Sequence, residues 1–243
     1  MYLIVDIGNT LAKFFLYNDD QWVVQKKVGL DFFFEKIETL IANYVGLEGL
    51  IYSDVSHRAE NFFKKYSDNF PVIKVGSGMR LPYTTDYKTP DSLGSDRIVL
   101  VAAACQTHFN TNVLIIDLGT CITYDFLSSD HVYRGGAISP GFEMRYKALQ
   151  YFSGSLPLLE SKVVENPQGK STKGSIHAGV YFGIVDEIKA RIDYYDSNYD
   201  SLTVILTGGD ANKLPKTLKN SIFAHSNFLA EGMFHLLKLN IDS

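Results

Sequence analysis

The first ten residues, MYLIVDIGNT (residues 1–10), place a carboxylate and a glycine directly after an apolar strand pattern. The strand pattern ends at Asp6, and Gly8 follows it with a pair of small polar residues. A second β-rich run occupies residues 11–17, so this part of the chain predicts a hairpin with a tight turn. That turn carries a carboxylate, a glycine and two side chains that form hydrogen bonds.

Residues 113–127 repeat this order. An apolar run ends in the sequence DLGT (residues 117–120), and a second β-rich run begins at Cys121. Two such turns, each at the end of a buried strand, predict two similar halves that face one ligand. The alternative at each place is an ordinary hairpin, because Asp and Gly are common turn residues.

The composition predicts a folded α/β protein of the cytoplasm. Of its 243 residues, 46% are hydrophobic and 21% charged, as in globular proteins. A net charge of −4 without a long basic run argues against a nucleic-acid partner. Cys105 and Cys121 form no C-x-x-C motif, which favours a reduced compartment over a disulfide framework. The sequence shows no signal-peptide pattern and no membrane-length apolar stretch, so we expect no membrane partner.

Strands followed by alternating helices and strands are predicted twice, with a division near residues 110–112. We therefore expect one α/β domain at residues 1–111 and a second at residues 112–243. Beyond the two hairpins, strands are predicted at residues 21–28, 50–55, 72–75, 131–134 and 202–206. Helices are predicted at residues 30–44, 57–68, 96–109, 142–151, 175–196 and 227–238.

The two Asp turns have a chemistry that suits a phosphate group and a metal ion. Glycine and small residues let backbone N–H groups approach phosphate oxygens. A carboxylate beside a phosphate is favourable only with a cation between them, and Mg²⁺ takes oxygen ligands and keeps several waters. Asn9, Thr10 and Thr120 then donate hydrogen bonds to phosphate. From the residues alone, K⁺ and Mg²⁺ remain alternatives at Asp117.

A third glycine-rich turn, TGGDA (residues 207–211), follows the strand predicted at residues 202–206. Its glycines, Gly208 and Gly209, let the backbone approach a flat or bulky ligand such as a nucleotide base or ribose. The alternative is a plain turn between a strand and a helix.

Together the three turns are similar to the phosphate-1, phosphate-2 and adenosine motifs of the acetate and sugar kinase/Hsp70/actin superfamily. Within it, the chain closely resembles the type III pantothenate kinase family from end to end. The most discriminating stretch is YKTPDSLGSDR (residues 87–97), similar to that family's Tyr-x-x-Pro…Gly-x-Asp-Arg signature. The stretch GGAISPG (residues 135–141) is also similar to a family hallmark. Thr89 departs from the family, which often has Asn there.

This resemblance implies a duplicated actin-like ATPase fold, with ribonuclease H-like α/β domains and a nucleotide cleft between them. It implies ATP-dependent phosphorylation of pantothenate to 4′-phosphopantothenate, the first step of coenzyme A synthesis. The implied cofactors are ATP with Mg²⁺, positioned by Asp6 directly or through water, and a monovalent cation, K⁺ or NH₄⁺, held by Asp117. The implied ATP-binding residues are Asp6, Ile7, Gly8, Asn9, Thr10, Leu11, Ala12, Lys13, Gly119, Thr120, Gly208 and Gly209.

Asp96 stands where a loop meets the helix predicted at residues 96–109. Asp at a helix start accepts hydrogen bonds from free N–H groups, so capping is one interpretation. The same position suits a general base that accepts the proton of a substrate hydroxyl as it attacks the γ-phosphate. Arg97 offers a planar fork to a substrate carboxylate, or forms a salt bridge. The resemblance implies that Asp96 is the base and that Gly94, Ser95, Asp96 and Arg97 line the pantothenate site.

Two further residues are implied as substrate contacts. Tyr87 alone predicts only packing, but its spacing to Asp96 matches the family. Thr172 matches a family threonine that contacts pantothenate from the partner subunit or the facing domain; its alternative role is a helix N-cap. Members of the family are homodimers, so we expect a homodimer, with the apolar-rich helix at residues 142–152 as one candidate surface.

Two other functions remain as alternatives. A sugar or acyl-phosphate kinase is disfavoured by the stretch at residues 87–97, because its Arg suits a carboxylate. A nucleotide-dependent regulator without catalysis is disfavoured by the intact carboxylates Asp6, Asp96 and Asp117.

Overall fold

In the computed structural model, contacts divide the chain into two units, each with a mixed β-sheet. The first unit contains residues 1–109 together with 226–243, and the second contains residues 110–225. Asn9 and Thr10, which the sequence assigns to the ATP-binding turn, lie outside the described residues. The structure describes residues 1–8, 11–44, 46–55, 58–216, 218, 221–224 and 227–241.

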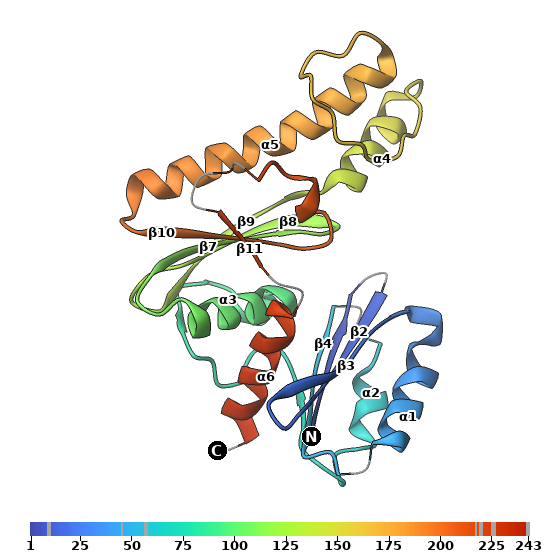
Figure 1. Cartoon of the computed structure of the whole chain (residues 1–243), viewed down its shortest axis with the longest axis vertical. Coiled ribbons are helices and arrows are strands. Elements are labelled where there is room, and N and C mark those ends of the chain that lie inside the picture. Colours follow the sequence, from blue (N-terminus) through green and yellow to red (C-terminus); the bar gives the residue numbers. More distant parts are fainter. Residues whose placement is uncertain are drawn as a thin grey trace. The chain divides into compact units, whose positions relative to one another are not determined.

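The first unit has a five-stranded sheet with the order β3-β2-β1-β4-β5 (Figure 1). β1 and β2 form the antiparallel hairpin that the first stretch of sequence predicts, while β1 and β4 run parallel. Parallel pairing brings the carboxyl ends of β1 and β4 to the same edge of the sheet. The strands are Tyr2–Ile7 (β1), Leu11–Asn18 (β2), Gln21–Gly29 (β3), Gly49–Asp54 (β4) and Val72–Lys74 (β5).

Two helices build the core on one face of this sheet. In α1 (Phe33–Asn43), the side chains of Phe33, Ile37 and Leu40 recur at helical spacing and are buried. They join a core with strand residues and with Phe63 of α2 (Glu60–Lys64). The unit also contains the short elements η1 (Leu30–Phe32), β6 (Thr84–Thr85) and η2 (Pro90–Ser92).

Helices α3 (Ser95–Thr107) and α6 (Phe228–Ile241) pack against each other in the first unit. A Cβ at Gly232 of α6 would lie 2.6 Å from the carbonyl oxygen of Val99, so glycine permits this close approach. The sequence division at 111/112 falls close to the first division of the units, but it assigned α6 to the second half. The spacing of apolar residues in a helix predicts that one side of the helix is buried. It does not predict against which half of the chain that side packs.

The sheet of the second unit has the order β11-β10-β7-β8-β9 within that unit. β7, β8 and β9 are antiparallel, whereas β10 runs parallel to β7 and β11 to β10. The strands are Asn112–Leu118 (β7), Cys121–Leu127 (β8), Val132–Pro140 (β9), Leu202–Thr207 (β10) and Ser221–Phe223 (β11).

The long helix α5 (Thr172–Asn198) runs along one face of this sheet, with α4 (Phe142–Ser153) beside its first turns (Figure 1). The short turn η3 (Ala211–Lys213) follows β10. Alternate strand residues point toward α5, so the core lies between sheet and helix. This core includes Leu114, Ile116, Leu118, Tyr124, Val180, Ile184 and Ile188.

The structure differs from the sequence prediction at β9 and β11. β9 continues through the glycine-rich stretch that begins at Gly135, where the sequence predicted a strand only at residues 131–134. A Cβ at Gly136 would lie 1.6 Å from the carbonyl oxygen of Tyr124, so this glycine serves a close approach between strands. β11 has three residues, too few to show a strand period.

None of the helices within the described ranges combines the length and the apolar character needed to span a bilayer.

We predict that Gly232→Ala lowers the melting temperature, because its Cβ would meet the Val99 carbonyl oxygen at 2.6 Å and the Ala103 Cβ at 2.8 Å. Overpacking of this kind costs about 1–3 kcal/mol, or roughly 2–10 °C in a chain of this size. Gly179→Ala is the matched control, since nothing lies within 4 Å of a Cβ at Gly179 in the middle of α5. Equal melting temperatures for the two variants would contradict the packing at Gly232.

Candidate active site

A row of three polar side chains crosses the first sheet. Asp6 of β1 pairs in register with Lys13 of β2 and with Ser53 of β4, so the three residues share one face. The Lys13 ammonium lies 3.1 Å from Asp6 Oδ2. Ser53 is fully buried, and its hydroxyl lies 2.9 Å from the hydroxyl of Ser95 at the start of α3. The row therefore connects Asp6 to the N-terminus of α3.

Asp6 is a buried carboxylate whose charge needs a nearby cation. Burial raises the pKa of Asp6, the charge and hydrogen bond of Lys13 lower it, and the negative charge of Asp96 raises it. The net effect is a raised pKa. A divalent cation beside Asp6 would favour the ionised form, so the residue fits the metal-positioning role that the resemblance implies.

The N-terminus of α3 holds the carboxylate of Asp96 in place. Gly94 is the N-cap and Asp96 the second helical residue, where its Oδ1 accepts a hydrogen bond from the backbone N–H of Arg97 at 2.9 Å. A Cβ at Gly94 would lie 2.5 Å from that same Oδ1. The side chain of Asp96 thus folds back over Gly94, and both interpretations of its position, capping and catalysis, are compatible with this geometry.

Arg97 and Tyr87 lie together in the first unit. The Arg97 side chain is 5% exposed, and its guanidinium carbon is 5.7 Å from the centroid of the Tyr87 ring. Stacking on an aromatic ring orients a guanidinium while leaving its N–H groups in the plane. The sequence predicted that these residues act with Asp96, and the structure places all three around the start of α3.

The described residues on either side of the first hairpin turn are Gly8 and Leu11, with Ile7 and Ala12 beyond them. The N–H of Gly8 donates to the carbonyl of Leu11 at 3.0 Å. Ile7 and Ala12 are core residues with at most 1% exposure, so only their backbone groups remain for ATP. Leu11 is 46% exposed.

In the second unit, the turn after β10 lies on the end of β7. Gly208 has φ +95, and a Cβ there would lie 2.5 Å from Asp117 Oδ1 and 2.4 Å from the carbonyl oxygen of Leu118. The backbone N–H of Asp210 donates to that carbonyl at 3.0 Å. A Cβ at Gly209 would meet nothing within 4 Å, which leaves room for a ligand. The structure therefore brings the predicted Asp117 and adenosine motifs into contact.

The end of β9 supports the turn between β7 and β8. Gly141 N donates to the Thr120 carbonyl at 3.1 Å, and Gly119 N donates to the Cys121 carbonyl at 3.0 Å. A Cβ at Gly141 would lie 2.4 Å from the carbonyl oxygen of Gly119 and 2.6 Å from that of Thr120. The GGAISPG stretch thus ends directly against the predicted phosphate turn.

Asp117 has threonines on both sides. It pairs in register with Thr123 of β8 and with Thr207 of β10. Thr123 is 7% exposed, and within the described ranges its Oγ1 is buried without a hydrogen-bond partner. A buried hydroxyl oxygen in the row of a carboxylate is a suitable oxygen ligand for a cation. The sequence analysis did not identify Thr123, because its place beside Asp117 follows from the register of β7 and β8.

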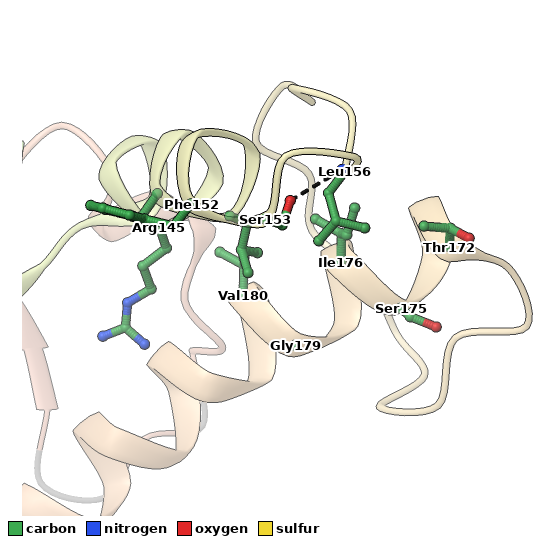
Figure 2. Close-up of a pocket in the computed structure, with 11 residues that line it drawn as sticks. Arg145, Phe152, Ser153, Leu156, Thr172, Ser175, Ile176, Gly179 and Val180 are labelled. Atoms are coloured by element: carbon green, nitrogen blue, oxygen red, sulfur yellow. Dashed lines mark hydrogen bonds between the residues drawn. The ribbon is translucent and has the colours of Figure 1, made fainter.

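Thr172 lies in a pocket of about 1010 Å³ between α4 and α5 (Figure 2). Thr172 is the first residue of α5, and the N-cap is Ser171, whose hydroxyl accepts from Gly174 N at 3.1 Å. The capping role considered for Thr172 therefore belongs to its neighbour. The pocket is lined by Arg145, Ala148, Leu149, Phe152, Ser153, Leu156, Thr172, Ser175, Ile176, Gly179 and Val180.

The predicted site residues that the structure describes divide between the two units, and Thr172 lies apart from the others of the second unit in the α4/α5 pocket. The first unit contributes Asp6, Ile7, Gly8, Leu11, Ala12, Lys13, Tyr87, Gly94, Ser95, Asp96 and Arg97. The second contributes Asp117, Gly119, Thr120, Thr172, Gly208 and Gly209.

The family model for type III pantothenate kinase matches residues 2–193 of the chain. A type III pantothenate kinase of Christiangramia forsetii is 43% identical over 241 residues, covering 99% of this chain and 99% of that protein. The chain belongs to the type III pantothenate kinase family. A second relative, the type III pantothenate kinase of Flavobacterium johnsoniae, is 38% identical over 246 residues and the whole of both chains.

Comparison with solved structures confirms the actin-like α/β fold of this family member. A proposed Baf family transcriptional activator from Campylobacter jejuni superposes with a TM-score of 0.66 at 25% identity, over 99% of this chain and 100% of that one. A glucokinase from an Antarctic psychrotroph superposes with a TM-score of 0.50 at 11% identity, over 98% of both chains. At that identity the likeness shows the fold alone.

Ser53 is a candidate site residue that the sequence analysis missed. It follows the apolar run of β4, and parallel pairing with β1 places it next to Asp6. The motif search followed the turns at Asp6, Asp117 and Gly208, and a serine at a strand end has no distinctive spacing. Its contact with Ser95 becomes visible only when the sheet order is known.

We predict that Gly94→Ala lowers turnover at least about tenfold while leaving the fold intact. The backbone of Gly94, at φ −57 and ψ 137, accepts alanine. The new Cβ would lie 2.5 Å from Asp96 Oδ1, which is too close, so it would displace that oxygen. Misplacing a reacting group by ~1 Å costs ~10²-fold in rate. Steady-state kinetics and a melting curve test this, with Gly76→Ala as the control because nothing lies within 4 Å of its Cβ. If the turnover of Gly94→Ala is unchanged, the Asp96 carboxylate takes no part in the reaction.

We also predict that Asp6→Asn unfolds at an equal or higher temperature than the natural protein at pH 7 without Mg²⁺. The pKa of Asp6 in the folded chain is higher than the ordinary pKa of aspartate. At a pH above that ordinary pKa, the ionised carboxylate therefore destabilises the fold. Asparagine removes this penalty, and the half-exposed Lys13 tolerates the loss of its partner. The same variant should lose Mg²⁺-dependent nucleotide binding.

Thermal melting and calorimetry with Mg·ADP measure the two effects of Asp6→Asn. Glu35→Gln, whose side chain is 73% exposed, is the control that should change neither. A drop of several degrees in Asp6→Asn would show that the charge of Asp6 stabilises the fold.

Proposed function

We propose that this chain transfers the γ-phosphoryl group of ATP to the terminal hydroxyl of pantothenate, giving 4′-phosphopantothenate and ADP, the first step of coenzyme A synthesis. The observation that carries this proposal is the start of α3, where the Arg97 N–H holds the Asp96 carboxylate and the Arg97 guanidinium stacks on the Tyr87 ring. A carboxylate base next to a planar cation suits a substrate with both a hydroxyl and a carboxylate. Family membership supports the same substrate.

In the proposed reaction, Asp96 accepts the proton of the pantothenate hydroxyl as that oxygen attacks the γ-phosphorus of ATP. The bond between the γ-phosphorus and the bridging oxygen breaks, and ADP leaves with the bonding electrons. Arg97 and Tyr87, with Gly94 and Ser95, hold pantothenate. Ser53 fixes the helix that carries this base, because its hydroxyl is 2.9 Å from that of Ser95.

The phosphates of ATP are held by the hairpin turns. Gly8 to Lys13 contribute backbone groups and the Lys13 ammonium, while Gly119 and Thr120 contribute N–H and hydroxyl groups. Gly208 and Gly209 leave space for the nucleoside. Asp6 would hold Mg²⁺, directly or through water, and the bound ion would supply positive charge next to the phosphates. Within the described residues no group of three His, Cys, Asp or Glu could hold a metal, but Mg²⁺ is usually held by one or two carboxylates together with substrate phosphates.

The monovalent cation, K⁺ or NH₄⁺, is proposed to lie at Asp117. The support is the row of Thr207, Asp117 and Thr123, together with the buried Thr123 hydroxyl that finds no hydrogen-bond partner in the described part of the chain. Asp117 supplies the charge and the threonines supply neutral oxygens.

A homodimer in the cytoplasm completes the proposal. On α4, Tyr151 is 76% exposed and Phe152 83%, and Met144 and Leu149 are also exposed. Contiguous exposed apolar side chains are typical of a protein–protein interface. Thr172 lines the adjacent pocket, so a second copy seated there lies within reach of it. Cys105 and Cys121 are free thiols, as expected of a reduced compartment.

The test is ADP production from ATP, measured with and without pantothenate in K⁺ and in Na⁺, with mass spectrometry of the product. We expect ADP formation to depend on pantothenate and to be higher in K⁺. If pantothenate gives no stimulation with any cation, the proposed function is wrong. Stimulation by glucose or acetate instead would favour a sugar or acyl-phosphate kinase.

Asp96→Asn should retain nucleotide affinity but lose turnover by ~10²-fold or more, because the variant lacks the general base. Calorimetry with ADP and single-turnover kinetics separate the two effects. Asp91→Asn is a suitable control, since Asp91 is an exposed acid in the loop before α3. A fully active Asp96→Asn enzyme would remove Asp96 from the base role.

A further inference from the structure

Arg145 of α4 lines the pocket between α4 and α5 (Figure 2). Its guanidinium nevertheless bonds to the end of β9. Its Nε donates to the carbonyl oxygen of Pro140 at 2.8 Å, and its Nη2 donates to Ser139 Oγ at 3.0 Å. The same Nη2 forms an ion pair with Glu187 of α5. One side chain therefore joins two helices to the last residues of a strand.

Glu187 holds this arrangement from the other side. Its Oε1 accepts from the Tyr124 hydroxyl at 2.8 Å, and its Oε2 accepts from Ser139 Oγ at 3.1 Å as well as from Arg145. Burial raises the pKa of Glu187, but the hydrogen bonds from Arg145, Tyr124 and Ser139 outweigh it and the pKa is lowered. The side chains of Arg145 and Glu187 are only 20% and 25% exposed, so the pair is shielded from solvent.

The segment that this pair holds is the one that supports the predicted phosphate turn. Gly141 follows Pro140 directly, and its N–H donates to the Thr120 carbonyl at 3.1 Å. The absence of a Cβ at Gly141 lets it lie against the carbonyl oxygens of Gly119 and Thr120. The Arg145 backbone N–H also donates to the Gly141 carbonyl at 3.1 Å. Arg145 thus contacts both ends of the short Pro140–Gly141 segment.

We propose that Arg145, held by Glu187, is a positioning residue that fixes the Gly119–Thr120 turn for nucleotide phosphate and links the α4/α5 pocket to that turn. The role of the turn in holding ATP rests on the proposed function. Neither residue touches the phosphates in this assignment. They act through Ser139, Pro140 and Gly141, whose backbone bounds the turn.

An ordinary surface ion pair does not explain these contacts. Lys147 and Glu143 on the same helix form such a pair, 3.8 Å apart with both side chains more than 60% exposed. It joins two residues of one helix and reaches no strand. Arg145 uses the fork of its guanidinium on three acceptors from two other elements, which a lysine with a single ammonium cannot reproduce.

The test compares Arg145→Ala, Arg145→Lys and Glu187→Gln with the control Lys147→Ala. ADP affinity is measured by calorimetry, and KM is measured separately for ATP and pantothenate. We expect Arg145→Ala to weaken ADP binding and to raise KM for ATP, each about tenfold. Residues that orient a binding group without touching the ligand typically have effects of about this size. Glu187→Gln should give a smaller change in the same direction, and Arg145→Lys should restore only part of the loss. KM for pantothenate should stay within about twofold.

Three outcomes would overturn the proposal. ADP affinities of Arg145→Ala and Glu187→Gln equal to that of Lys147→Ala would show that the turn does not need the pair. A rise in KM for pantothenate alone would mean that Arg145 acts inside the pocket. Equal rises for both substrates with a lowered melting temperature would mean general loss of structure. If Arg145→Ala does not fold, Arg145→Lys and Glu187→Gln decide on the same measurements.

The proposed function fails separately from this inference. A natural protein that binds ADP but never phosphorylates pantothenate refutes the proposed substrate, whereas the comparison of ADP affinities still judges the role of Arg145.

Discussion

The buried carboxylate of Asp6 is the constraint around which the polar groups of the first unit are arranged. It lies near the end of β1, whose residues from Leu3 to Ile7 are buried, and its charge is balanced by Lys13 from one neighbouring strand and bordered by Ser53 from the other. Ser53 then bonds to Ser95, which begins the helix with Asp96. A polar row in the sheet therefore sets where the helix starts, and the helix sets where its carboxylate lies. Burying this one charge is costly, and the Mg²⁺ proposed to lie beside Asp6 would offset part of that cost.

In the second unit, close backbone approach takes the place of the charged row. Gly208 and Gly141 each lie where a Cβ would come within 2.7 Å of a carbonyl oxygen of the β7–β8 turn. Two chain segments far apart in sequence are thereby packed onto the same turn. Glycine loses conformational freedom on folding at these positions. Because it has no Cβ, its backbone groups stay open to a phosphate or a nucleoside.

The hairpins and most of the longer elements followed from the sequence, because apolar runs that end in Asp-x-Gly have a clear period and a clear stop. The actin-like fold was implied by the resemblance of the three turns to known motifs. The family followed from the stretch at residues 87–97. The roles of the individual site residues stay predictions. The sequence could not predict the places of Ser53 and Thr123, because these depend on the order of the strands. Only the folded sheets show that Ser53 lies beside Asp6 and Thr123 beside Asp117. Likewise, the pairing of Arg145 with Glu187 joins two helices whose spacing in sequence says nothing of their contact.

The place of α6 has a consequence for how the chain is made. This helix packs on α3, and Gly232 fits against the backbone of Val99, yet more than a hundred residues of the second unit are synthesised between the two. While the ribosome makes the second unit, the apolar side of α3 that packs on α6 has no native partner. The first unit is therefore completed only after the second has been made, and the loss of α6 would damage the unit that carries Asp6 and Asp96.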